Sequence, residues 1–205
     1  MNSSKLNEQI YAYLGFHSVE RSEEVDAEIS KCLDELKELA HFRYTYKFFS
    51  ALPDFLLCEP YTEYLRGSSG VIVAVMTLGC EVDARIKFYG RTDAAKSLVL
   101  DAAASAYLEY LSDEYEKTLG ENLSYRFCPG YGGSSVEDLK HIFEILSPEK
   151  IGVTLSETNY MLPSKSMAGI IAVGGKAKKS CKNCIVYEHC NLRKGGAKCY
   201  GSEKL

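Results

Sequence analysis

Apolar residues recur at helical spacing in the first part of the chain. Residues 5–14 are predicted to form a short helix that ends at Gly15, and residues 22–40 a longer one. One face of the longer helix is apolar and consists of Val25, Ile29, Cys32, Leu33, Leu36 and Leu39. The acidic residues between these positions are interpreted as a solvent-exposed helix face rather than a binding site.

Two segments in the first half of the chain have the pattern of β-strands. Residues 42–48 alternate aromatic with polar side chains, a period of two that predicts a half-buried strand with its rings in the core of a sheet. Residues 71–78 form a continuous apolar run, which predicts a central strand buried on both faces. Residues 151–155 and 168–173 are predicted to form two further strands.

Two more helices are predicted between residues 78 and 151. Thr92 is placed to cap a long helix that ends near Gly120. Residues 134–137 match a capping box, and an apolar helical stripe follows it, made of Leu139, Ile142, Phe143 and Leu146. These elements predict an α+β domain with a twisted, mainly antiparallel sheet and helices packed on it.

Composition and charge exclude several classes of protein. A chain of 205 residues suits one domain, predicted at residues 1–175, with a tail at residues 176–205 after Gly174 and Gly175. Apolar residues make up 46% and charged residues 25%, and a net charge of −4 gives no general reason to bind nucleic acid. No apolar run is long enough to span a bilayer and no signal pattern opens the chain, so we expect a cytoplasmic protein without membrane contacts.

The tail is basic and contains four closely spaced cysteines. They follow the pattern Cys181-x2-Cys184-x5-Cys190-x8-Cys199. Four thiolates at such spacing hold one zinc ion tetrahedrally or ligate an iron–sulfur cluster without needing a large core. Free thiols or a disulfide pair are the alternatives, and His189 is an alternative ligand.

An arginine stands beside a glycine-rich turn in the segment YRFCPGYGG. Pro129 fixes φ, while Gly130 and the two glycines after Tyr131 allow positive φ and so expose backbone N–H groups. The guanidinium of Arg126 suits a carboxylate or phosphate, and Tyr131 adds an aromatic face. The pattern fits an anionic, partly flat ligand, or an ordinary loop with a surface charge.

Residues 125–171 as a whole resemble the activation domain of cobalamin-dependent methionine synthase. The resemblance depends on RFCPGYG and, some twenty residues later, IGVTLSETNYMLPSKSMAGII, and the upstream lengths resemble the short, free-standing form of that domain. It implies an S-adenosylmethionine site that serves the reductive remethylation of cob(II)alamin. The residues it implies for that site are Arg126, Cys128, Pro129, Gly130, Tyr131 and Glu157.

The resemblance gives these residues roles. Arg126 is expected to hold the methionine carboxylate at the surface, with little effect on the fold, and the turn amides near Cys128 and Gly130 to orient the rest. Glu157 is expected either to contact the ligand or to bond turn amides. No residue has the setting of a nucleophile or general base, so the cofactors would supply the chemistry.

The implied protein is the activation subunit of a cobalamin-dependent methionine synthase or of a related corrinoid methyltransferase. Its partners would be the cobalamin-binding module and an external one-electron donor such as flavodoxin or ferredoxin.

Two features depart from the resemblance and keep other functions open. Ser105 stands where an acidic residue is expected to pair with the ligand's amino group, and Asp101 or Glu109 could take its place. The C-terminal hairpin of that domain is also missing. The alternatives are an iron–sulfur reductive activator of corrinoid proteins and a non-catalytic subunit that has lost the ligand.

Overall fold

The computed structural model describes residues 3–16, 22–175 and 188 of the chain. Helices and strands alternate irregularly along these residues, as an α+β fold requires. In chain order the elements are α1 Ser3–Tyr13, α2 Glu23–Leu39, β1 Arg43–Phe49, the 3-10 helix η1 Asp54–Leu56, α3 Tyr61–Tyr64, β2 Gly70–Thr77, α4 Cys80–Thr92, α5 Ala94–Glu116, η2 Val136–Asp138, α6 Leu139–Leu146, η3 Pro148–Ile151, β3 Thr154–Leu155, β4 Met161–Leu162 and β5 Ser166–Val173.

The main sheet has three antiparallel strands in the order β1-β2-β5. The central strand β2 is buried along its whole length, as its continuous apolar run predicts. Along the outer edge of β5, Phe127 exchanges two backbone hydrogen bonds of 2.8 Å with Ile170. The segment before the glycine-rich turn is thereby fixed against β5.

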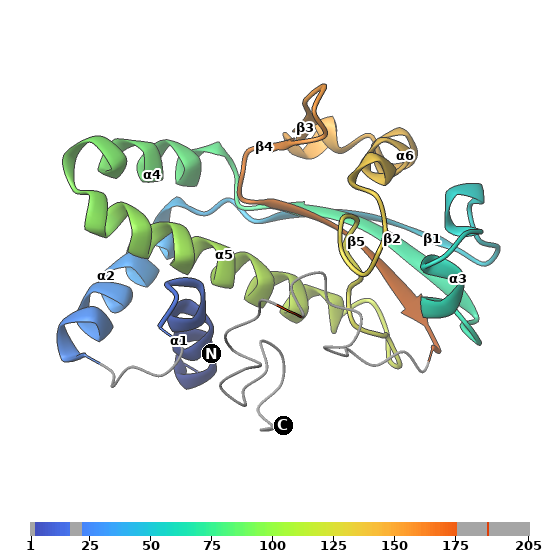
Figure 1. Cartoon of the computed structure of the whole chain (residues 1–205), viewed down its shortest axis with the longest axis horizontal. Helices are drawn as coiled ribbons and strands as arrows, with labels where there is room; N and C mark the ends of the chain where they lie inside the picture. The colour runs from blue at the N-terminus through green and yellow to red at the C-terminus, as the bar shows by residue number, and fades with distance from the viewer. Residues whose placement is uncertain (1–2, 17–21, 176–187, 189–205) are drawn as a thin grey trace.

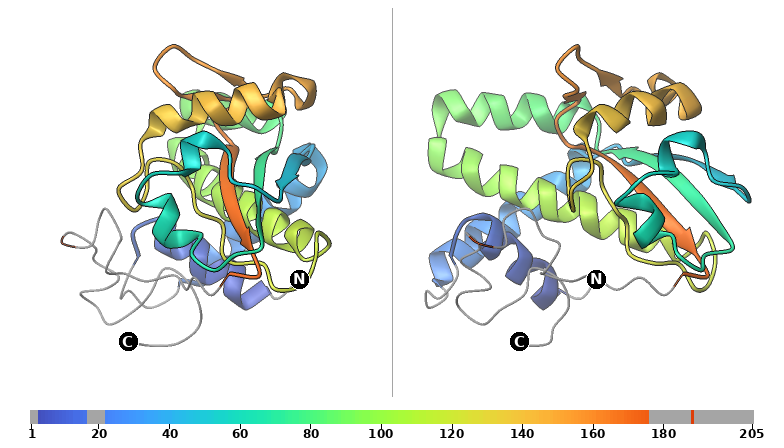
Figure 2. Two further views of the ribbon diagram at one scale, coloured as in Figure 1. Left: turned by 90° about the vertical axis from the view of Figure 1, so that its right-hand side faces the viewer. Right: turned by 45° about the vertical axis from the view of Figure 1, so that its right-hand side comes forward.

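Helices cover both faces of this sheet (Figure 1, Figure 2). Alternate residues of β2 point to opposite faces, so Ile72 belongs to the core cluster that includes residues of α1, α2 and α5, while Val73 belongs to the cluster that includes residues of α3 and α6. The small β3–β4 sheet lies on the α6 side. The predicted α+β class, with an antiparallel sheet and packed helices, is confirmed.

The long helix begins one residue later than the sequence predicts. Thr92 ends α4, where its hydroxyl donates to the Phe88 carbonyl at 3.1 Å, and the cap of α5 is Asp93, whose carboxylate accepts from the Lys96 amide at 3.0 Å. Either side chain can cap a helix, so the pattern alone could not separate two consecutive helices. The apolar stripe of α6 is buried as predicted, and so is the middle of the α2 stripe, whereas its end residues Val25 and Leu39 are partly buried.

Three local predictions are wrong. Most of 151–155 is not a strand, because a 3-10 turn and Gly152 with φ 81° precede a β3 of only two residues. Ser135, rather than a full capping box, accepts from the Glu137 amide at 3.1 Å. On β1, Tyr46 and Phe48 are 45% and 52% exposed, because β1 is an edge strand of the main sheet. The ring contacts of this segment with α5 are made by Tyr44 and by Phe42, just before the strand.

No helix within the described ranges has the length and apolarity needed to cross a membrane. The predicted tail at residues 176–205 lies outside the described residues, apart from Glu188. The division into a domain and a tail therefore stays a prediction.

Candidate functional site

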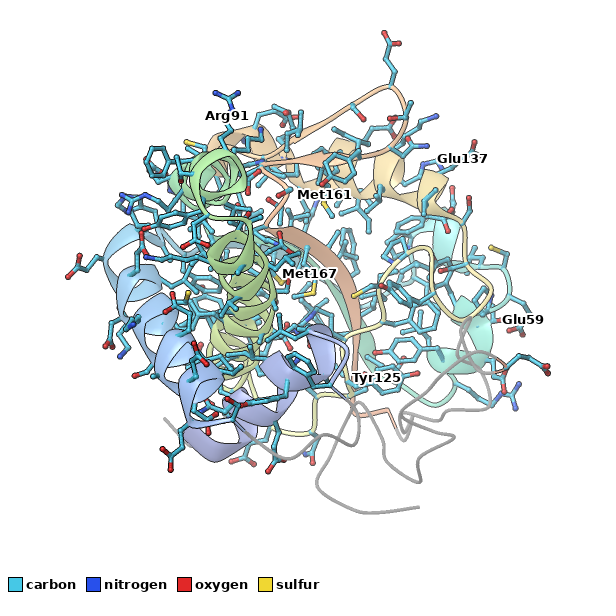
Figure 3. All side chains as sticks on the ribbon, turned by 60° about the vertical axis from the view of Figure 1, so that its left-hand side comes forward. Glu59, Arg91, Tyr125, Glu137, Met161 and Met167 are labelled. Carbon is cyan, nitrogen blue, oxygen red and sulfur yellow. The ribbon has the colours of Figure 1, made fainter. Side chains whose placement is uncertain are left out.

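Arg126 lies on the face of β5 that is turned toward α5. Because neighbouring residues of an extended segment point to opposite faces, Phe127 enters the core on the α6 side and Arg126 takes the α5 side. The stem of Arg126 covers Gly169, where a Cβ atom would lie 2.2 Å from Cγ and 2.6 Å from Cδ of the arginine. The glycine is required because any side chain at position 169 would displace Arg126. Figure 3 shows this region, with Met167 marking β5 and Tyr125 the residue before Arg126.

Two carboxylates of α5 receive the guanidinium of Arg126. Nη1 donates to Glu116, and Nη2 donates to Asp113 Oδ1 at 3.1 Å. The Arg126 side chain is only 5% exposed and that of Glu116 12%, whereas that of Asp113 is 64% exposed. Tyr44 also donates to Glu116, at 3.2 Å. Arg126 is therefore a buried, ion-paired residue, and its expected surface position is wrong.

The electrostatics agree with a permanently charged Arg126. Burial alone would lower the pKa of its guanidinium, but the carboxylates of Glu116 and Asp113 raise that pKa above its ordinary value. Burial raises the pKa of the Glu116 carboxyl group, and the Arg126 charge opposes this effect. Removing Arg126 would leave the nearly buried Glu116 carboxylate without its cation, and removing Glu116 would leave the buried guanidinium with only the exposed Asp113. Either loss is costly.

A second cation lies on the same side of α5. Lys165 precedes β5, and its ammonium group donates to Asp101 at 2.8 Å and to the Ser105 hydroxyl at 3.0 Å. Glu109 follows one turn further along α5 and accepts from the Tyr13 hydroxyl at 2.9 Å. Asp101, Ser105, Glu109 and Asp113 are four residues apart in turn, so they share one side of the helix, here called the polar stripe of α5. Lys165 and Arg126 lie at its two ends.

The loop before β5 is fixed by hydrogen bonds from motif residues. The buried carboxylate of Asp83 on α4 accepts from the Ser164 amide at 2.6 Å, the Ser164 hydroxyl at 2.9 Å and the Lys165 amide at 3.3 Å. The Ser166 hydroxyl donates to Thr77 at 2.9 Å. In the described structure, the serines of MLPSKSMAG thus position Lys165 and the start of β5.

The glycine-rich turn is largely bonded within itself. The Gly130 amide, predicted to face a ligand, donates to the Ser134 hydroxyl at 3.1 Å, and that hydroxyl donates to the Tyr131 carbonyl at 2.7 Å. Gly130 has φ 87°, and a Cβ there would lie 2.7 Å from Val136 Cγ1. Pro129 is buried and Cys128 partly buried. Tyr131 is exposed. Burial and the nearby Glu109 raise the pKa of the Tyr13 hydroxyl, and Tyr131 adds a smaller contribution to that rise.

Glu157 lies apart from this group. It is exposed in the turn between β3 and β4, on the α6 side of the sheet (Figure 1). The bonds within that turn are made by Ser156, whose amide donates to the Tyr160 carbonyl and whose hydroxyl accepts from the Tyr160 amide. In the structure Glu157 therefore neither bonds the turn amides nor lies beside Arg126.

Sequence reasoning missed three members of the site, namely Asp113, Glu116 and Lys165. The four-residue spacing of polar residues along α5 was a usable signal, because such residues share a helix face. Lys165 stands inside a segment already singled out, but nothing in the pattern indicated its burial.

The predicted metal ligands, Cys181, Cys184, Cys190 and Cys199, lie outside the described residues, as does His189. Within the described ranges, no three histidine, cysteine or acidic side chains gather closely enough to hold a metal ion. The metal site stays a prediction.

Comparisons with known proteins identify a shared fold. No protein-family model and no curated protein matches the chain. A solved structure described as the MetH reactivation domain bound to AdoHcy matches with a TM-score of 0.57 and 18% identity, over 86% of this chain and 73% of that one. The chain has the fold of the MetH reactivation domain. The fold resemblance to the activation domain of methionine synthase is thereby confirmed.

Gly169→Ala is expected to destabilise the protein by about 1–3 kcal/mol, because the added methyl group overpacks the Arg126 stem. Urea denaturation measures the change. Gly90→Ala, within α4, is the matched control, since a Cβ atom at position 90 would meet only the Ser97 hydroxyl at an ordinary 3.6 Å. Equal stability of both variants would show that Arg126 does not need an empty position 169.

Truncation after Gly175 is expected to leave the melting temperature of the domain nearly unchanged and to remove any bound zinc or iron, because the four cysteines lie beyond that point. Metal analysis of protein prepared without oxygen provides the measurement. A full-length protein that carries neither metal would contradict the metal site and favour free thiols.

Proposed function

We propose that this chain is the activation subunit of a cobalamin-dependent methionine synthase or of a related corrinoid methyltransferase, and that it binds S-adenosylmethionine for the reductive remethylation of cob(II)alamin. The observation that carries the proposal is the contact between Arg126 and Gly169. It joins the two separate segments on which the resemblance depends. The fold shared with a reactivation domain bound to AdoHcy supports the same function.

The charges along α5 suit the amino-acid end of S-adenosylmethionine, which has a carboxylate and an ammonium group. Arg126 is the cation that binds the carboxylate of the ligand. Asp101 is neutralised by Lys165, but Glu109 accepts a hydrogen bond from the neutral Tyr13 and forms no ion pair with any other described residue. Glu109 is thus the better substitute for the acidic residue that Ser105 replaces. Ser105 instead accepts a hydrogen bond from Lys165.

The proposed role of the chain is to bind and orient rather than to react. Bound S-adenosylmethionine supplies the methyl group, cobalamin on the partner module accepts it, and a one-electron donor such as flavodoxin or ferredoxin reduces the cobalt. This chain would hold the ligand by its charged end against α5. Fixed charges on a helix and a sheet are suited to such positioning. Zinc or an iron–sulfur cluster held by the tail would form a second site, separate from the ligand site.

Glu109→Gln is expected to weaken binding of S-adenosylmethionine and S-adenosylhomocysteine by roughly 1.5 kcal/mol, because a charge-assisted bond to the ammonium group is lost. Calorimetric titration measures the affinities. Glu114→Gln is the matched control, since Glu114 also lies on α5 but pairs with Lys117. An equal loss in both variants would assign the effect to general charge, and no binding by the wild type would favour a subunit that has lost the ligand.

Activation itself is tested by reconstitution. The protein is mixed with a cobalamin-loaded methyltransferase module, a reductant and S-adenosylmethionine, and the methylcobalamin absorbance is expected to return. Omitting this chain is the control. Failure to restore the absorbance with every corrinoid protein of the same cell would contradict the activator function.

A further inference from the structure

The two carboxylates on Arg126 are not equivalent. Glu116 is nearly buried and is also bonded by Tyr44, so it belongs to the inner side of the ion group. Asp113 is 64% exposed, and within the described residues its carboxylate accepts a hydrogen bond only from Arg126 Nη2. The outward-facing nitrogen of the arginine is therefore covered by a carboxylate that is largely in water.

We infer that Asp113 is a specificity-determining residue that occupies the position of a ligand carboxylate on Arg126. The inference depends on the proposed function, because it concerns the same arginine and the same ligand. In this arrangement a ligand carboxylate replaces Asp113 on Nη2, while Glu116 stays on Nη1. Asp113 thereby lowers the affinity for every ligand that uses this subsite and admits only a group that can match its charge.

The exchange is physically reasonable because Arg126 does not have to move. Its stem is fixed on Gly169, and Glu116 holds the inner nitrogen. The buried cation remains paired throughout, since one carboxylate leaves as another arrives, so the large cost of an unpaired buried charge is avoided. Asp113 moves into water, where an exposed carboxylate loses little.

Competition and general electrostatics predict opposite results for the loss of Asp113. S-adenosylmethionine carries a net positive charge, so removing a nearby acid would weaken its binding if only the overall field mattered. If Asp113 competes for Arg126, the same change strengthens binding. The sign of the effect therefore separates the two explanations.

The test measures binding of S-adenosylmethionine, and of the net-neutral S-adenosylhomocysteine, to the wild type and to Asp113→Asn by calorimetry. We expect the variant to bind about two- to fivefold more tightly, the range for one exposed ion pair. Decarboxylated S-adenosylmethionine and 5′-methylthioadenosine lack the carboxylate and should show no gain. Glu114→Gln, with the same charge change at the next residue, should show no gain for any ligand.

The outcomes separate the inference from the proposed function. Tighter binding restricted to carboxylate ligands, or binding that is detectable only in the variant, supports the inference. If the wild type binds S-adenosylhomocysteine and Asp113→Asn binds it equally or more weakly, the function stands and the inference is overturned. If neither protein binds, both fail. Asp113→Ala provides a second variant, and thermal melting of the empty proteins confirms folding, because an exposed Asp113 should contribute little to stability.

Discussion

A buried guanidinium must have its charge paired within the fold, and much of this structure is arranged around that requirement for Arg126. The pairing of Phe127 with Ile170 turns Arg126 toward α5, and the missing side chain of Gly169 leaves room for its stem. The helix then supplies Glu116 at the buried end and Asp113 at the exposed end. A strand register, a glycine and a helix position therefore depend on one another.

The contact between α5 and β5 is consequently polar along one side. From Asp101 to Asp113 the helix rises roughly 18 Å, and a buried cation is paired at each end of that length. Apolar packing continues beside it, where Ile171 and the alanines of α5 join the core. Because Arg126 is held against β5 and Lys165 is held by the loop before it, the two cations are fixed before any ligand arrives, which reduces the cost of ordering them on binding.

The motif that spans the loop before β5 and the start of β5 serves the fold as much as any ligand. Ser164 and Ser166 bond Asp83 and Thr77, and Gly169 makes room for Arg126. A sequence likeness at these positions therefore records how the start of β5 is built. In the proposed function Arg126, which holds the ligand carboxylate, lies within the segment that carries the resemblance, whereas the acidic side chains come from α5, which lies outside it.

The sequence by itself determined the elements whose pattern is local and strong. The period of the apolar residues located α2 and α6, a continuous apolar run located β2, and the two motif segments indicated the fold. Only the tertiary structure decided that Thr92 ends a helix while Asp93 begins the next, that Tyr46 lies on an edge strand, and that Arg126 is buried. Such features depend on which segments meet in space, because burial and ion pairing are set by residues far apart in the chain. From the sequence alone, an arginine beside a glycine-rich turn is interpreted as a surface charge. The tertiary structure shows that α5 covers it.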